Sequence, residues 1–138
     1  MELQTELRDT PVSRQTKFLL AEDDEINREI VRSLLEIRGG IDLVVVEDGR
    51  AALETSMVQK FDLMIFDRQM PHLTGDRVIR CLRAAQTINS RTPMILFTAS
   101  ADQSTVTAGL NGLADMILPK PIRAEDFFAA LDRLVTAG

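Results

Sequence analysis

Five side chains suited to metal or phosphate chemistry each follow a short apolar run in this sequence. They are Asp23 and Asp24 after residues 18–21, Asp67 after residues 61–66, Thr98 after residues 94–97, and Lys120 after residues 114–118. Three carboxylates, one hydroxyl and one ammonium group thus recur at the same place relative to an apolar run. If the runs are neighbouring parallel strands, their carboxyl ends bring all five side chains to one edge of a sheet.

The predicted chemistry of this group is phosphoryl transfer assisted by a metal ion. Clustered carboxylates repel one another and raise at least one pKa unless a cation lies between them. Their oxygen atoms favour a hard cation, so we expect Mg²⁺, with Mn²⁺ as a substitute. The single His and single Cys exclude a zinc or copper cluster. Beside the metal, Asp67 could attack a phosphoryl group as a nucleophile, while Lys120 and the Thr98 hydroxyl offset its charge.

Each of these residues also has an ordinary structural interpretation. Asp24 stands where it could cap the next helix, and this role is compatible with metal binding. A single Asp such as Asp67 is most often a loop residue, and neither Thr98 nor Lys120 is informative alone. The chemical interpretation is favoured because all of them fall at the same predicted sheet edge.

The elements that must position these residues alternate between strand-like and helix-like segments. Five apolar runs are predicted as strands buried on both faces, at residues 18–21, 41–46, 61–66, 94–97 and 114–118. Apolar residues at helical spacing separate or follow them, at residues 26–35, 51–57, 78–82, 102–110 and 127–135. This alternation predicts an α/β fold: a doubly wound five-stranded parallel sheet in the flavodoxin-like order 2-1-3-4-5, with helices on both faces.

Length and composition fit one domain in a soluble protein. With 138 residues, 45% of them hydrophobic, we expect a domain at residues 17–138 behind a flexible tail or linker at residues 1–16. A net charge of −5 argues against binding nucleic acid or an anionic membrane surface. The sequence contains neither a membrane-spanning apolar run nor the apolar core of a signal peptide, so we expect a cytoplasmic protein. Cys81 lies in a helical pattern and is predicted to be buried or half-buried.

Several sequence blocks resemble the signature motifs of response-regulator receiver domains of two-component signalling. The blocks are LLAEDD at residues 19–24, EDGRAAL at residues 47–53, DRQMP at residues 67–71 with Gly75 beyond it, Thr98-Ala99, and Lys120-Pro121. Their order and spacing are similar to those of the family over about residues 17–136. The resemblance implies that Asp67 is the phosphoacceptor and Asp24 a direct Mg²⁺ ligand. It further implies that Asp23 acts mainly through water and that Gln69 contributes its backbone carbonyl to the metal.

The same resemblance implies a signalling function. Thr98 is then the switch hydroxyl and Lys120 the phosphate-binding lysine. The phosphoryl group would come from a histidine kinase or a histidine phosphotransfer protein, and the signal would pass to a downstream protein partner. Such a chain catalyses only its own phosphorylation and dephosphorylation and is expected to be a monomer or weak dimer. Residues 24–29 are similar to receivers of hybrid kinases, so a stand-alone regulator and a receiver from a hybrid kinase are both compatible with the sequence.

One departure from the family pattern leaves an alternative function open. Ile117 lies where the family usually has Tyr or Phe, three residues before the lysine, so ring burial cannot report phosphorylation. Helix 102–110 contains weak helix formers, including Gly109, and its order could carry the switch instead. The alternative is a docking module that keeps the fold without switching. An aspartate-dependent phosphatase is set aside because Gln69 cannot serve as the general acid that such an enzyme needs.

Overall fold

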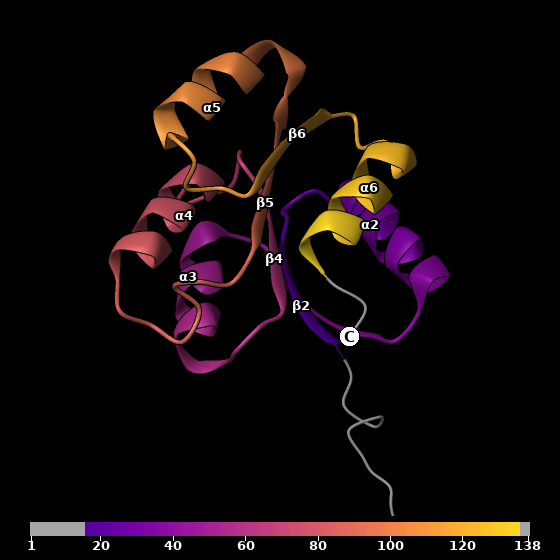
Figure 1. Cartoon of the computed structure of the whole chain (residues 1–138), viewed down its shortest axis with the longest axis horizontal. Helices are drawn as coiled ribbons and strands as arrows, with labels where there is room; N and C mark the ends of the chain where they lie inside the picture. The colour runs from indigo at the N-terminus through magenta and orange to yellow at the C-terminus, as the bar shows by residue number, and fades with distance from the viewer. Residues whose placement is uncertain (1–15, 136–138) are drawn as a thin grey trace, which may run out of the picture.

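The computed structural model describes residues 16–135, which form a parallel β-sheet between two layers of helices (Figure 1). The strands are β2 (Thr16–Ala21), β3 (Ile41–Val46), β4 (Leu63–Asp67), β5 (Met94–Ala99) and β6 (Met116–Lys120). The helices are α2 (Glu25–Arg38), α3 (Gly49–Val58), α4 (Gly75–Ala84), α5 (Gln103–Leu110) and α6 (Ala124–Leu134), with a short 3₁₀ turn, η2 (Ser100–Asp102), before α5.

The sheet has the predicted topology. Its strands run in the order β3-β2-β4-β5-β6, and every neighbouring pair is parallel. The first strand along the chain therefore lies between the second and the third, which confirms the predicted order 2-1-3-4-5. Helices α3, α4 and α5 cover one face, and α2 and α6 cover the other (Figure 1). The strand order reverses between β2 and β4, and such sheets bind ligands beyond the carboxyl ends of the strands at this point.

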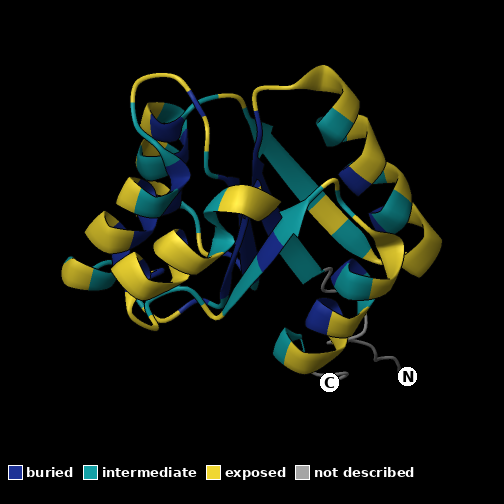
Figure 2. Ribbon diagram, turned by 90° about the horizontal axis from the view of Figure 1, so that it is seen from above, coloured by how far each residue is buried: buried dark blue, intermediate teal, exposed yellow. Residues whose placement is uncertain are grey.

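Two hydrophobic cores lie on the two faces of the sheet. Because successive strand residues point to opposite faces, Leu19 joins the core beneath α3 to α5, whereas Phe18 and Leu20 join the core beneath α2 and α6. All residues of β4 are buried, while the edge strand β3 is only partly buried. Figure 2 shows the central strands buried and the outer faces of the helices exposed. The prediction of burial on both faces thus holds for the central strands and fails for the outer strand β3.

Local sequence signals account for several helix ends. Asp24 and Asp48 cap α2 and α3, each accepting a hydrogen bond from a backbone N–H three residues ahead. Helix α2 ends at Gly39, whose φ of 78° lies in the region that favours glycine. Helix α5 has no side-chain cap at its start and ends at Asn111 in the left-handed conformation. The segment predicted as helix 102–110 is observed as a short helix behind a 3₁₀ turn.

Residues 1–15 of the predicted tail lie outside the described residues, and Thr16 belongs to β2. The prediction for Cys81 was wrong, because this side chain is exposed. Helix α4 turns Val78, Ile79 and Leu82 to the core, and Cys81 falls beside that stripe. Among the described helices, none is long and apolar enough to cross a membrane.

Candidate functional site

The predicted site residues follow from four strand ends at one edge of the sheet. Asp23 lies two residues beyond β2, and Asp67 is the last residue of β4. Thr98 lies near the end of β5, and Lys120 is the last residue of β6. The register pairs Asp67 with Phe97 and Thr98 with Pro119, so these neighbouring strands reach the same edge.

The loop after Asp67 is held against the end of its strand. The Arg68 N–H donates to the Phe97 carbonyl at 2.9 Å, and the Gly75 N–H donates to the Arg68 carbonyl at 2.9 Å. Gly75 packs so closely that an added Cβ would collide with the Asp67 carbonyl oxygen. Met70 is buried in the core and anchors the middle of the loop. The backbone around Asp67 is therefore fixed by packing, which keeps its carboxylate in one place.

Asp67 and Lys120 form a short ion pair at the centre of the site. The Lys120 Nζ lies 2.7 Å from Asp67 Oδ1 and 3.4 Å from Glu22 Oε1. The Asp67 side chain is 5% exposed and the Glu22 side chain 2% exposed. One ammonium group thus bridges two carboxylates that water barely reaches, and such contacts are strong because the surroundings are poorly polarisable.

Burial and mutual charge shift the pKa values of this group. Burial, a side-chain hydrogen bond with Asp67 and the charge of Asp67 raise the pKa of Glu22 to about 7 against the opposing effect of Lys120. Burial alone would lower the pKa of Lys120, but its hydrogen bond to Asp67 and the charges of both carboxylates outweigh burial and raise it. The site therefore carries more negative charge than its single ammonium group neutralises.

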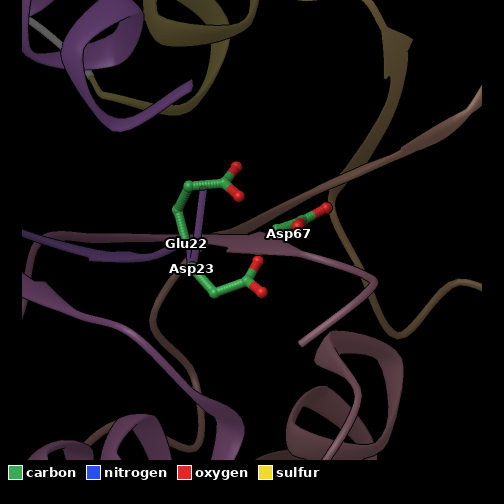
Figure 3. A group of neighbouring side chains, drawn as sticks. All are labelled: Glu22, Asp23 and Asp67. Carbon is green, nitrogen blue, oxygen red and sulfur yellow. The ribbon is translucent and has the colours of Figure 1, made fainter. Parts of the chain in front are cut away.

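Three carboxylates come close enough to hold one metal ion. Oxygen atoms of Glu22, Asp23 and Asp67 all lie within 4.8 Å of one another. Figure 3 shows Glu22 and Asp23 projecting from the end of β2 beside Asp67. An all-oxygen, negatively charged set of ligands fits a hard divalent cation such as Mg²⁺. The raised pKa of Glu22 agrees with this, since a cation would relieve the same repulsion.

Asp24 has a different place from the one predicted for a direct metal ligand. Its Oδ2 accepts a hydrogen bond of 2.9 Å from the Asn27 N–H at the start of α2, and the residue is exposed. The capping interpretation is confirmed, while the group of three carboxylates contains Glu22 and Asp23. Sequence reasoning missed Glu22, although it is the first acidic residue after the strand ends at Ala21.

The other residues singled out in the sequence lie in β5, in β6 and in the loop after β4. Thr98 is 2% exposed and lies one residue beyond the partner of Asp67. Gln69 lies two residues after Asp67 in the loop, with an exposed side chain. Ile117 is half-buried against the core beneath α3 to α5, and its carbonyl accepts a hydrogen bond of 2.9 Å from Gln103 Nε2. His72, in the same loop as Gln69, is exposed.

The sequence matches a known family along most of its length. The family model of the response regulator receiver domain matches residues 18–132. Relatives include the transcription factor SKN7 of Candida albicans, 35% identical over 83% of this chain, and the response regulator ArlR of Staphylococcus saprophyticus, 31% identical over 84%. The sensor histidine kinase AruS of Pseudomonas aeruginosa is 33% identical over 88% of this chain. The chain matches 20%, 50% and 12% of these three proteins, so it spans half of their length or less.

Solved structures of similar proteins have the same architecture. The receiver domain of a sensor histidine kinase from Pseudomonas aeruginosa, solved with magnesium in its active-site cleft, has a TM-score of 0.78 at 27% identity. The alignment covers 90% of this chain and all of that one. The chemotaxis response regulator CheY4 of Vibrio cholerae has a TM-score of 0.75 at 27% identity, over 88% of this chain and all of that one.

Proposed function

Because this chain belongs to the family of response regulator receiver domains, we propose that it takes a phosphoryl group from a phosphohistidine donor onto Asp67 in a Mg²⁺-dependent reaction. The observation that carries the proposal is the buried Asp67 carboxylate, paired with Lys120 at 2.7 Å beside two further carboxylates. This arrangement offers a nucleophile, a cation for the phosphoryl oxygens and ligands for a metal. Phosphoryl transfer needs little else from a protein.

The metal would be held by the chain's own carboxylates. We assign Asp23 and Asp67 as ligands, Glu22 as a ligand or as a partner of the metal's water molecules, and the Gln69 backbone carbonyl as a further ligand. When bound, Mg²⁺ would neutralise the cluster and bind phosphoryl oxygens. The acidic group supports this assignment, as does the magnesium ion in the cleft of the similar Pseudomonas receiver. Asp24 caps α2 through its Oδ2 and is not assigned to the metal.

The chemical step uses the Asp67 carboxylate as the nucleophile. One oxygen atom of Asp67 forms a bond to phosphorus while the phosphorus–nitrogen bond of the donor imidazole breaks, and the electron pair of that bond stays on nitrogen. Lys120 then contacts the phosphoryl oxygens in place of the carboxylate. Thr98 lies on the neighbouring strand β5, and we assign its hydroxyl as the group that turns toward the new phosphoryl group. Its movement would alter the loop that leads into α5.

The partners follow from this chemistry. We propose a histidine kinase or a histidine phosphotransfer protein as the donor and a downstream protein as the receiver of the signal. The reaction would take place in the cytoplasm, with the chain as a monomer or weak dimer. The relatives include both a sensor histidine kinase and a response regulator, so a stand-alone regulator and a kinase-borne receiver are both compatible.

Mass spectrometry after incubation with acetyl phosphate and Mg²⁺ tests the proposal. We expect a gain of one phosphoryl group in the wild-type protein and none in Asp67→Asn. The gain should also disappear when Mg²⁺ is chelated. A wild-type protein that stays unmodified under these conditions would contradict the proposal and favour the docking module, for which Ile117 in place of an aromatic ring is the supporting observation.

A further inference from the structure

The backbone that carries two of the carboxylates is held by an arginine from the next helix. Arg28 Nη1 donates hydrogen bonds to the carbonyl of Glu22 at 3.1 Å and to the carbonyl of Asp23 at 3.0 Å. These are the two residues that contribute carboxylates beside Asp67. A single guanidinium nitrogen therefore joins the peptide groups of both residues. Both residues lie between the end of β2 and the start of α2, so Arg28 restrains a connecting segment outside regular secondary structure.

Arg28 is itself well placed for this role. Its backbone N–H donates to the Asp24 carbonyl at 3.0 Å, so it lies in the first turn of α2, and its side chain is half-buried. The loop has further restraints. The Glu22 N–H donates to the Val46 carbonyl at 3.0 Å and the Asp24 N–H to Glu22 Oε2 at 3.2 Å, and Asp24 Oδ2 caps the helix. None of these fixes the carbonyl of Asp23.

We propose that Arg28 is a positioning residue for Mg²⁺, acting through the backbone of Glu22 and Asp23. The inference rests on the proposed function, since it presumes that the acidic group binds the metal. By holding both carbonyls, Arg28 directs the two side chains toward Asp67 before the cation arrives. Groups that orient metal ligands typically change metal affinity by 10–100-fold when they are removed.

Because Arg28 is positively charged, its positioning effect and its electrostatic effect on Mg²⁺ affinity have opposite signs. A guanidinium group close to a cation site repels the cation, so Coulomb's law predicts that its removal strengthens Mg²⁺ binding. Loss of positioning predicts the opposite, because ordering the loop would then be a cost of binding. The sign of the change in affinity therefore distinguishes the two effects.

Arg32 offers a matched control one helical turn further along α2. Its Nε lies 3.4 Å from Glu29 on the same helix, in an exposed pair. The substitutions Arg28→Met and Arg32→Met remove the same charge from the same helix and leave a similar aliphatic chain. Arg28→Lys keeps the charge and a donor with shorter reach, so it should restore part of the effect and serves as the second variant if Arg28→Met does not fold.

Calorimetric titration of the metal-free full chain with Mg²⁺ tests the proposal. We expect the Kd to rise about tenfold in Arg28→Met, to rise less in Arg28→Lys, and to stay the same or fall in Arg32→Met. Amide exchange at residues 22–24 without metal should be faster in Arg28→Met and unchanged in Arg32→Met. Equal Mg²⁺ affinity in the two Met variants, or unchanged exchange in Arg28→Met, would overturn the inference.

The same titration separates this inference from the proposed function. A wild-type protein that binds Mg²⁺, together with an Arg28→Met variant that binds it equally well, overturns only the role of Arg28. A wild-type protein that does not bind Mg²⁺ overturns the metal site and, with it, the positioning role.

Discussion

Glu22 links the acidic group to its single ammonium partner. Its carboxylate is within 3.4 Å of Lys120 Nζ, accepts a hydrogen bond from the Asp24 N–H, and lies beside Asp67. The same burial and charge that suit it to a cation raise its pKa to about 7 when no cation is present. The charged form of Glu22 is therefore disfavoured, and a bound metal ion would stabilise that form.

The metal-free protein should therefore lose stability as the pH rises through the titration of Glu22. A raised pKa means that the folded state binds the proton more tightly than the unfolded state does, so this stabilisation is complete below about 4.5 and is lost as the pH rises through about 7. The contribution is at most on the order of 3 kcal/mol. Urea unfolding at several pH values, with a chelator present, measures it.

The substitution Glu22→Gln is the control for that titration. It keeps the size of the side chain and removes its charge, so the fall in the free energy of unfolding between pH 5 and pH 8 should be smaller than in the wild type. Saturating Mg²⁺ should also flatten the wild-type profile. The pKa of Glu22 would not be raised if wild type and Glu22→Gln showed the same profile.

The acidic residues also show how far sequence alone can predict a site. The alternation of strands and helices and the position of polar and charged residues after apolar runs correctly placed Asp67, Thr98 and Lys120 at one edge. The sequence could not decide which of three consecutive acids face the site. That choice depends on the turn after Ala21, where Asp24 is drawn to the start of α2. It also depends on the long side chain of Arg28, whose target cannot be read from its position in a helix.

At the scale of elements, arginine side chains from elsewhere in the chain contact α5 and its flanking turns. Arg80 Nη2 donates to the Gly109 carbonyl at 2.7 Å, near the end of the helix, and Arg83 Nε donates to the Leu113 carbonyl at 2.9 Å. Arg68 lies 3.7 Å from Asp102 at the start of the helix. Arg68, the residue after Asp67, and two arginines of α4 thus contact α5 or its flanking turns. A short helix with weak propensity can change its order when such contacts shift.

Amide exchange in residues 99–113 should therefore respond to a phosphoryl mimic. We expect beryllofluoride with Mg²⁺ to change exchange rates in this segment of the wild type, because the loop after Thr98 leads directly into α5. Gly109→Ala should reduce the response, since alanine stabilises a helix by about 1 kcal/mol over glycine and this position has space for a Cβ. Hydrogen–deuterium exchange with mass spectrometry measures both.

An unchanged pattern in the wild type would mean that the signal does not pass through α5. Since Ile117 has no ring to bury, that outcome would favour the docking module over a switching receiver. The weak propensity of the helix could be predicted from its Thr and Gly content, whereas the arginine contacts could not. Surface arginines have many accessible partners, and only the packed arrangement of α4 against α5 selects among them.

At the scale of the whole molecule, the carboxyl and amino ends of the strands differ in what they contribute: the first carries the candidate site, the second a buried hydrogen-bond network. The carboxyl edge gathers charged groups whose mutual repulsion costs stability. At the opposite edge, the buried side chain of Asn89 accepts from the Phe61 N–H and the Thr92 hydroxyl, each at 2.9 Å. It also donates to the carbonyls of Ser56 and Gln59, each at 2.6 Å. This network joins the end of α3, the start of β4 and the loop before β5.

Stability and metal binding should therefore be separable by substitution at the two edges. Asn89→Ala removes the partners of the buried Phe61 N–H and the buried Ser56 carbonyl, each at a cost of about 1–3 kcal/mol, and that of the half-buried Gln59 carbonyl. We expect the free energy of unfolding in urea to fall by about 3 kcal/mol or more, while the Kd for Mg²⁺ measured below the unfolding transition stays unchanged. Gln86→Ala, at an exposed position in the same loop, should change stability by less than about 0.5 kcal/mol. A large loss of Mg²⁺ affinity in folded Asn89→Ala would show instead that the two edges are coupled through the sheet.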